Sequence, residues 1–381
     1  MDFRLNTEQQ ALADTVARWC ANAYSGAARK QRLDAGPEGG TALWADMSAM
    51  GWHGAGVGES DGGFGGGVVE NAILMEAFGR ALVVEPFLSS SVLALQTLVA
   101  LPEGDLRDEL VAGAIAGEHV LAIAHVEDGN GEEIAGIRTA ATHTHAGWHV
   151  DGSKSFAVGA PCARKILLSA RTTSGIGLFV ADADSVAPMS RPYRTLDNLH
   201  AADYRLTAAP VLAMELDSRR AEAALAHGMA HALVAQCAEA VGAMDTAISL
   251  TVDYVRTRRQ FGQTLNGFQS VQHRLADMLV EAELSRSILY SGMAALTRDG
   301  AQRVRALSAM KAVVARAALF VGRQAIQLHG GMGITEDCFV SHLYRRLFVI
   351  AGQFGNESFH LSRMARTAPD DPDAPQIAPT P

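Results

Sequence analysis

The chain has 381 residues, of which 48% are hydrophobic, enough to build two or three packed units with apolar cores. It carries 32 Lys and Arg against 41 Asp and Glu, a formal net charge of −9, and has no basic block. Because nucleic-acid binding needs cations that neutralise phosphates, we do not expect a nucleic-acid partner. The four cysteines lack zinc-site spacing, so we expect no metal site. No long apolar run or signal-like opening segment is present, which predicts a cytoplasmic protein without membrane contact.

Residues 1–117 show the apolar spacing of helices. Leu12, Val16 and Trp19 recur at helical intervals, and a second stripe follows at 73–83. The glycine-rich run at 62–67 follows no strand and does not fit the GxGxxG pattern, so it predicts a tight connection and not a dinucleotide loop. We therefore predict an amino-terminal helical domain.

Residues 118–215 change to short β-rich runs separated by Gly, Asp, Asn and Pro. The runs predicted as strands lie at 119–126, 148–158, 165–170, 176–180 and 204–206. His143 and His145 alternate in a strand-like segment, but without a third ligand they are expected to face solvent. This pattern of short strands and turn residues predicts a compact β domain.

Residues 216–368 return to helical periodicity, with an apolar stripe from Leu225 to Val255 and further helices at about 268–297 and 302–328. We predict long antiparallel helices joined by short loops. The proline-rich residues 369–381 are too poor in apolar side chains to order themselves and are expected to form a disordered tail.

Two polar clusters interrupt the carboxyl-terminal helices, at 258–262 with Gln269 behind it and at 327–333. Arg258 offers a planar charged fork for a pyrophosphate, and Phe261 offers a flat apolar face. Gln269 and Gln327 can each donate and accept hydrogen bonds, while Gly330 and Gly331 allow a ligand to approach the backbone. Together the clusters suit a large, flat, anionic cofactor.

These motifs resemble those of the acyl-CoA dehydrogenase family over nearly the whole chain. The run 254–262 reads Tyr-x-x-x-Arg-x-x-Phe-Gly, 327–333 reads Gln-x-x-Gly-Gly-x-Gly, and 61–66 with 76–81 resembles the family's amino-terminal pattern. The resemblance implies an α+β fold with a helical amino-terminal domain, a middle β-barrel and a carboxyl-terminal four-helix bundle. It also implies that the two clusters bind FAD held mainly by a neighbouring subunit. Phe156 would supply an aromatic face to the flavin.

The family's catalytic base is missing from both places where the resemblance locates it. One position, at the usual distance after the double glycine, holds Phe354, and the other, on the first long carboxyl-terminal helix, holds Ala232. Glu357 is the first substitute candidate, although a carboxylate at a helix start is the simpler reading of it. His231, beside Ala232, is more typical of a satisfied core or interface residue.

The half of the flavin site on this chain's own β domain also departs from the family pattern. Residues 126–133 place acidic side chains where members carry a hydroxyl, and 152–158 keep the aromatic Phe156 but lose a hydroxyl at Val158. A carboxylate beside a pyrophosphate would repel it.

This chain keeps the motifs that would bind a neighbour's FAD but lacks those that would hold its own FAD and supply the base. We therefore hypothesise that two different chains share these functions. The ending at 354–361 resembles the small-subunit type of the pimeloyl-CoA and steroid side-chain dehydrogenases, which pair as heterotetramers in which the partner supplies the base. The expected ligands and partners are FAD, an acyl-CoA substrate, a paralogous dehydrogenase subunit and an electron-transfer partner. Two alternatives remain open: a self-sufficient homotetramer that uses Glu357, and a non-catalytic scaffold subunit.

Overall fold

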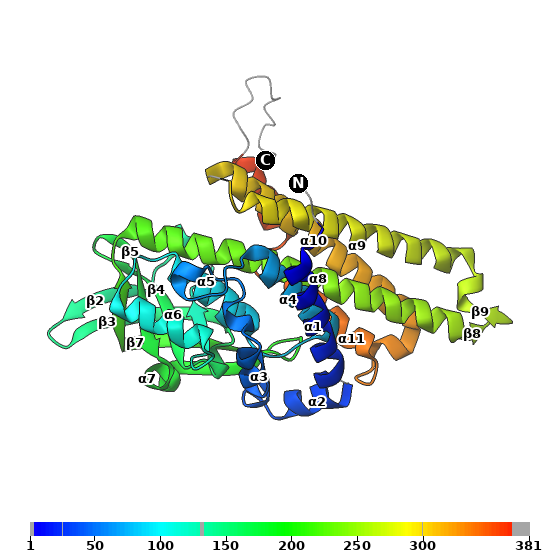
Figure 1. Ribbon diagram of the computed structural model, residues 1–381, viewed down its shortest axis with the longest axis horizontal. Helices are drawn as coiled ribbons and strands as arrows, with labels where there is room; N and C mark the ends of the chain where they lie inside the picture. The colour runs from blue at the N-terminus through cyan, green and yellow to red at the C-terminus, as the bar shows by residue number, and fades with distance from the viewer. Residues whose placement is uncertain (1–3, 25, 130–132, 299, 368–381) are drawn as a thin grey trace, which may run out of the picture.

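The computed structural model describes residues 4–24, 26–129, 133–298 and 300–367, so the predicted tail at 369–381 lies outside the described residues. Helices come first, a β-barrel follows, and long helices complete the chain (Figure 1). No described helix is long and apolar enough to cross a membrane.

The amino-terminal part is helical. Its α-helices are α1 Thr7–Ala23, α2 Gly26–Asp34, α3 Trp44–Ala49, α4 Val68–Ala81, α5 Leu95–Val99 and α6 Asp105–Ile115. Asn6 starts α1 with a capping box, since its Oδ1 accepts from the Gln9 backbone N–H at 2.8 Å and Gln9 Oε1 accepts from the Asn6 N–H at 3.1 Å. A π-helix, η4 Leu88–Ala94, runs directly into α5; π-turns of this kind are frequent at functional sites.

The middle part is a β-barrel. Its strands are β1 Leu121–Ala124, β2 Ala140–Thr144, β3 Gly147–Val158, β4 Lys165–Thr172, β5 Gly175–Asp182, β6 Ser190–Arg194 and β7 His200–Glu215, with the short helix α7 Ala183–Val186 after β5. The pairings β4–β2, β2–β3, β3–β7, β7–β5 and β5–β4 close a ring, while β1 adds to β4 and β6 to β7. The predicted β-barrel is thereby confirmed.

Two features of the barrel differ from the expected strands. β6 was not predicted, because its sequence Ser-Arg-Pro-Tyr-Arg has no apolar alternation; it is an edge strand, where proline is tolerated. β7 is also much longer than the predicted 204–206 and pairs in turn with β3, β6 and β5. Its alanine-rich sequence carries little strand signal, so tertiary pairing sets its length.

The carboxyl-terminal part is a bundle of long helices. They are α8 Ser218–Thr257, α9 Gln269–Ala295, α10 Gly300–His329, α11 Phe339–Gly352 and α12 Glu357–Arg366. Asp217 caps α8 by accepting from the Arg220 backbone N–H at 3.1 Å. The order of helices, barrel and helical bundle confirms the predicted α+β architecture.

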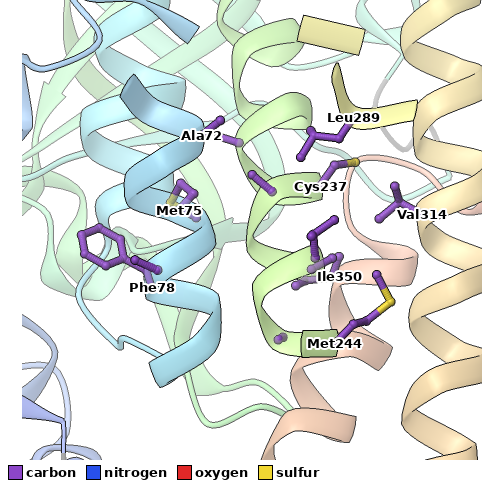
Figure 2. Packing of buried hydrophobic residues seen from close by; sticks show 14 of the residues in the cluster. Ala72, Met75, Phe78, Cys237, Met244, Leu289, Val314 and Ile350 are labelled. Carbon is purple, nitrogen blue, oxygen red and sulfur yellow. The ribbon is translucent and has the colours of Figure 1, made fainter. Parts of the chain in front are cut away.

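The main core lies where α4, α8, α10 and α11 meet. Figure 2 shows α4, with Met75 and Phe78, beside α8, and Cys237 and Met244 of α8 near Val314 and Ile350; the Phe78 ring points away from α8. The α4 and α8 backbones approach so closely that a Cβ on Gly79 would lie 2.0 Å from the Glu239 carbonyl oxygen, and one on Gly242 1.9 Å from that of Glu76. Glycine is therefore required at both positions to seat α8 against the amino-terminal helices.

Candidate functional site

A short β-hairpin at the carboxyl end of α8 presents the first polar cluster. Strands β8 Arg259–Gln260 and β9 Gln263–Thr264 pair antiparallel, and Phe261 and Gly262 form the turn. Both turn residues have positive φ, 53° and 85°, as two-residue hairpin turns require. Positive φ is strained for a bulky residue, yet the Phe261 side chain is 87% exposed. Its ring meets that of Phe268 edge to face with centroids 6.2 Å apart, and this contact leaves most of the Phe261 side chain exposed.

The second polar cluster lies beside the first because α8 and α10 end together. The Tyr254 ring of α8 stacks on the His329 ring of α10 with centroids 4.4 Å apart, and the Tyr254 hydroxyl donates to the His329 carbonyl at 3.3 Å. Gly330, with φ of 62°, ends α10, and a Cβ on Gly330 or Gly331 would meet no atom within 4 Å. The backbone there is open to a ligand.

The predicted cofactor-binding side chains of both clusters face solvent. Gln269 is the first residue of α9 and Gln327 lies on the last turn of α10, and both are exposed. Arg258 caps α8, and no described carboxylate pairs with its exposed guanidinium. We call the following set the clamp: Arg258, Phe261, Gln269, Gln327, Gly330 and Gly331.

The clamp lies far from the barrel of its own chain. α8 has 40 residues and, at a rise of about 1.5 Å per residue, spans about 60 Å. Its first residue contacts the barrel, where Ser218 Oγ accepts from the Ile176 backbone N–H at 2.9 Å, and its last residues carry the hairpin (Figure 1). The clamp and the barrel of one chain therefore cannot grip the same small molecule.

A separate cleft lies between the barrel and the helices α8, α11 and α12. Its outer part has a volume of about 840 Å³ and includes Phe156 of β3, Phe348 of α11 and Gly355. Deeper, a cavity of about 50 Å³ is lined by Phe354, by Met229 of α8 and by Leu88 of η4. Phe156 and Phe354 both have positive φ, 54° and 59°, so two strained aromatic residues stand in this cleft.

Of the predicted base positions, only that of Phe354 lies in the deep part of the cleft. The Phe354 side chain lines two cavities there, and the Phe354 carbonyl accepts from His360 Nε2 at 2.8 Å. Glu357 is the first residue of α12, behind the N-cap Asn356, and it lines none of the cavities that Phe354 lines. Ala232 is packed in the core, whereas the cleft face of α8 carries Leu225 and Met229. Sequence reasoning missed Met229 because family spacing does not show which way a helix faces.

His231 lies outside these cavities. Burial lowers the pKa of His231 to about 3, with smaller contributions from His227 and Arg303 in the same direction. It is therefore neutral at pH 7, and its ring lies 4.5 Å from that of His227. No group of three or more potential metal ligands occurs in the described part of the chain.

A buried ion pair holds the barrel wall next to the cleft. Lys154 Nζ donates to Glu127 Oε1 at 2.8 Å, and Glu127 also accepts from the Thr139 hydroxyl and the Arg138 backbone N–H. Burial would raise the pKa of Glu127, but the hydrogen bonds from Lys154 and Thr139 lower it from 4.5 to about 2. Burial lowers the pKa of Lys154 to about 8, although the hydrogen bond to Glu127 and its negative charge act to raise it. Both groups are therefore charged at pH 7.

This pair predicts an acid-sensitive fold. Because the unfolded chain takes up the Glu127 proton at higher pH than the folded one, the stability that this carboxylate contributes is complete above about pH 4.5. It is lost as the pH falls toward 2. In denaturant titrations at a series of pH values, Glu127→Gln should be less stable at pH 7 and should show a smaller loss on acidification. If the free energy of unfolding fell equally with pH in the two proteins, this assignment would be contradicted.

Comparisons with known proteins agree with this arrangement. The protein-family model "Acyl-CoA dehydrogenase, N-terminal domain" matches residues 6–118, and "Acyl-CoA dehydrogenase, C-terminal domain" matches residues 222–368. The chain belongs to the acyl-CoA dehydrogenase family.

Individual relatives support the assignment across most of the chain. Acyl-CoA dehydrogenase fadE12 of Mycobacterium bovis is 29% identical over 365 residues, which cover 88% of this chain and 89% of that protein. FadE34 of Mycobacterium tuberculosis is 29% identical over 375 residues, or 94% of this chain and 47% of that protein. A variant of the Tcur3481-Tcur3483 steroid ACAD is similar in structure, with a TM-score of 0.85 and 27% identity, covering 94% of this chain and 97% of that one.

Acyl-CoA dehydrogenases use FAD, and the two candidate sites fit that cofactor unequally. The clamp offers a guanidinium without a described carboxylate partner, an exposed aromatic ring and open glycine backbone, which suit a pyrophosphate and a flat ring. The outer cleft offers the Phe156 ring, but its described lining holds the carboxylate of Glu133, which pairs with Arg366 at 3.1 Å, and no Lys or Arg. Glu132 lies outside the described residues. The clamp therefore fits the anionic part of FAD better than this chain's own cleft does.

Proposed function

We propose that this chain is a subunit of a heteromeric, FAD-dependent acyl-CoA dehydrogenase. Its clamp supplies half of a flavin site, and a paralogous partner chain supplies the rest of that site and the catalytic base. The observation that carries the proposal is Phe354, an aromatic side chain in the deep cavity where the family's carboxylate would stand. A hydrocarbon ring cannot accept the α proton of an acyl-CoA thioester.

The position of the clamp supports a flavin site shared between two chains. Its side chains are exposed and lie about 60 Å along α8 from the barrel, so they serve a ligand held by another chain. FAD, when bound, accepts the hydride from the β-carbon of the thioester. The clamp residues take no part in that hydride transfer. Arg258 neutralises the pyrophosphate of FAD, and Phe261 covers a flat ring of the cofactor. An electron-transfer partner would reoxidise the flavin.

Similarity to a two-component enzyme adds to this argument. The steroid ACAD named for Tcur3481 and Tcur3483 is 27% identical to this chain over nearly its whole length. We infer a comparable pairing here, with an acyl-CoA thioester as substrate.

The test is to co-express this chain with whatever acyl-CoA dehydrogenase-like chain is encoded next to it and to count flavin. The purified complex is expected to hold one FAD per two chains and to oxidise an acyl-CoA, while this chain alone binds flavin weakly and is inactive. The comparison of complex and single chain uses the same absorbance assay and the same electron acceptor. One FAD per chain and full turnover in the isolated protein would contradict the proposal.

A further inference from the structure

A buried lysine organises a line of side-chain amides that ends at the cleft. Lys311 of α10 is 0% exposed, and its Nζ donates to Gln236 Oε1 at 3.1 Å and to the Ile350 carbonyl. Gln236 of α8 is equally buried, and its Nε2 donates to Gln353 Oε1 at 2.7 Å. The line thus joins α10, α8 and the residue that caps α11.

The chemistry of lysine fixes the direction of every hydrogen bond in this line. Lys311 Nζ donates to the Gln236 oxygen, so Gln236 turns its Nε2 to Gln353. Gln353 must then use its oxygen as the acceptor. Its Nε2 is left as a donor, and none of the described residues accepts from it in a hydrogen bond.

That donor belongs to a side chain that lines the cleft. Gln353 contributes to the outer cleft and to both of the smaller cavities that share Ser89 and Val158. The side chain is held in place, because the Gln353 backbone N–H donates to the Val349 carbonyl at 3.0 Å and Gln236 binds its oxygen. A donor fixed in this way loses little conformational entropy when a ligand binds.

The surroundings of Gln353 indicate what kind of group it binds. Leu88, Ile123 and Val126 make the deep cavity largely apolar, and its described lining contains no carboxylate, Lys or Arg. The Gln353 Nε2 is not among the buried unpaired atoms, so it stays accessible from the cleft, and an uncharged acceptor can pair with it there without bringing in a charge. Hydrogen bonds in series also polarise one another, so the bond from Lys311 strengthens the donor at the far end.

We propose that Gln353 Nε2 is the hydrogen-bond donor that holds the carbonyl oxygen of an acyl thioester in this cleft. Lys311 and Gln236 are its positioning residues. The chain then binds a carbonyl ligand next to Phe354 without being able to deprotonate it. This inference goes beyond the proposed function, since it concerns the cleft of this chain and not the clamp.

The test is calorimetric titration of the full chain with octanoyl-CoA. We expect octanoyl-CoA to bind, and Gln353→Leu to weaken that binding about 3- to 10-fold through loss of one hydrogen bond. Gln353→Glu should weaken it further, because a carboxylate turns an acceptor toward the carbonyl oxygen. If Gln353 only fills space, the isosteric Glu variant should bind better than the Leu variant, and that order would overturn the proposal. Absence of octanoyl-CoA binding by the wild-type chain would overturn it too.

A substitution away from the ligand tests the positioning role. Gln236→Glu keeps an acceptor for Lys311 but has no donor for Gln353, so the Gln353 amide should turn over and point its oxygen into the cleft. We expect affinity for the same ligand to fall about as far as in Gln353→Leu, about 3- to 10-fold, while thermal stability is retained through the new ion pair. Unchanged affinity in a folded Gln236→Glu protein would show that the line does not orient Gln353. Flavin counts of the heteromeric complex do not enter these titrations, so the two proposals can fail separately.

Discussion

Replacing Arg346 by methionine is expected to lower the free energy of unfolding by about 3–5 kcal/mol, because it leaves two buried carboxylates without a counter-charge. Arg346 Nε and Nη2 each donate to Glu239 at 2.6 Å, and Nη1 donates to Asp197 at 2.7 Å. All three side chains are buried. Burial would lower the pKa of Arg346, but Glu239 and Asp197 outweigh it and raise the pKa above its ordinary value. Thermal and urea unfolding, followed by circular dichroism, measure the loss.

The neighbouring Arg345 provides a matched control on the same helix. It pairs with Glu336, whose side chain is 72% exposed, at 2.8 Å. Because exposed ion pairs contribute little, Arg345→Met is expected to cost no more than about 1 kcal/mol. Equal destabilisation by the two substitutions would contradict the distinction between the buried and the exposed pair.

The Arg346 triad matters for the cleft because it ties three parts of the fold together. Glu239 lies on α8, Arg346 on α11, and Asp197 in the connection between β6 and β7. Arg346 and Glu239 also line one of the small cavities beside Gln353. The triad therefore holds the barrel against the helices at the point where the cleft is formed.

Arg258→Gln is expected to weaken flavin retention in the proposed heteromeric complex about 10- to 100-fold, since it would remove the charge-assisted, bidentate contact to a pyrophosphate that we propose for Arg258. The Arg258 side chain is exposed and none of the described carboxylates pairs with it, so its loss should leave the chain's own stability almost unchanged. The measurement is the FAD dissociation constant of the complex, from flavin fluorescence on dilution, together with its melting temperature.

Arg256→Gln is the matched control for the clamp. Arg256 is also exposed and lies on the last turn of α8, two positions before Arg258 in the sequence but outside the clamp. The complex that carries Arg256→Gln should retain FAD as strongly as the wild-type complex. If Arg258→Gln left the FAD affinity of the complex unchanged, this chain would instead be a scaffold subunit that plays no part in flavin binding.

Several elements could be predicted from the sequence because their signals are local. The long apolar stripe of α8 continues for many turns, and the predicted helices at 268–297 and 302–328 match α9 and α10 to within a few residues. β6 escaped prediction because an edge strand buries little and needs no apolar alternation. The candidate clamp followed from motifs that each occupy one short stretch of chain.

The sequence by itself determined the order of helices, barrel and helical bundle, the family, and the absence of a carboxylate at Phe354. These follow from periodicity and from motifs of adjacent residues. Only the tertiary structure decided which side chains share the cleft: Met229 and not Ala232 faces it, and Gln236 meets Gln353 across 117 positions of the chain. The physical reason is that the direction of a side chain depends on how helices pack against one another. No local pattern records the buried Lys311 that orients Gln353, because their connection runs through three separate helices and exists only once they are packed.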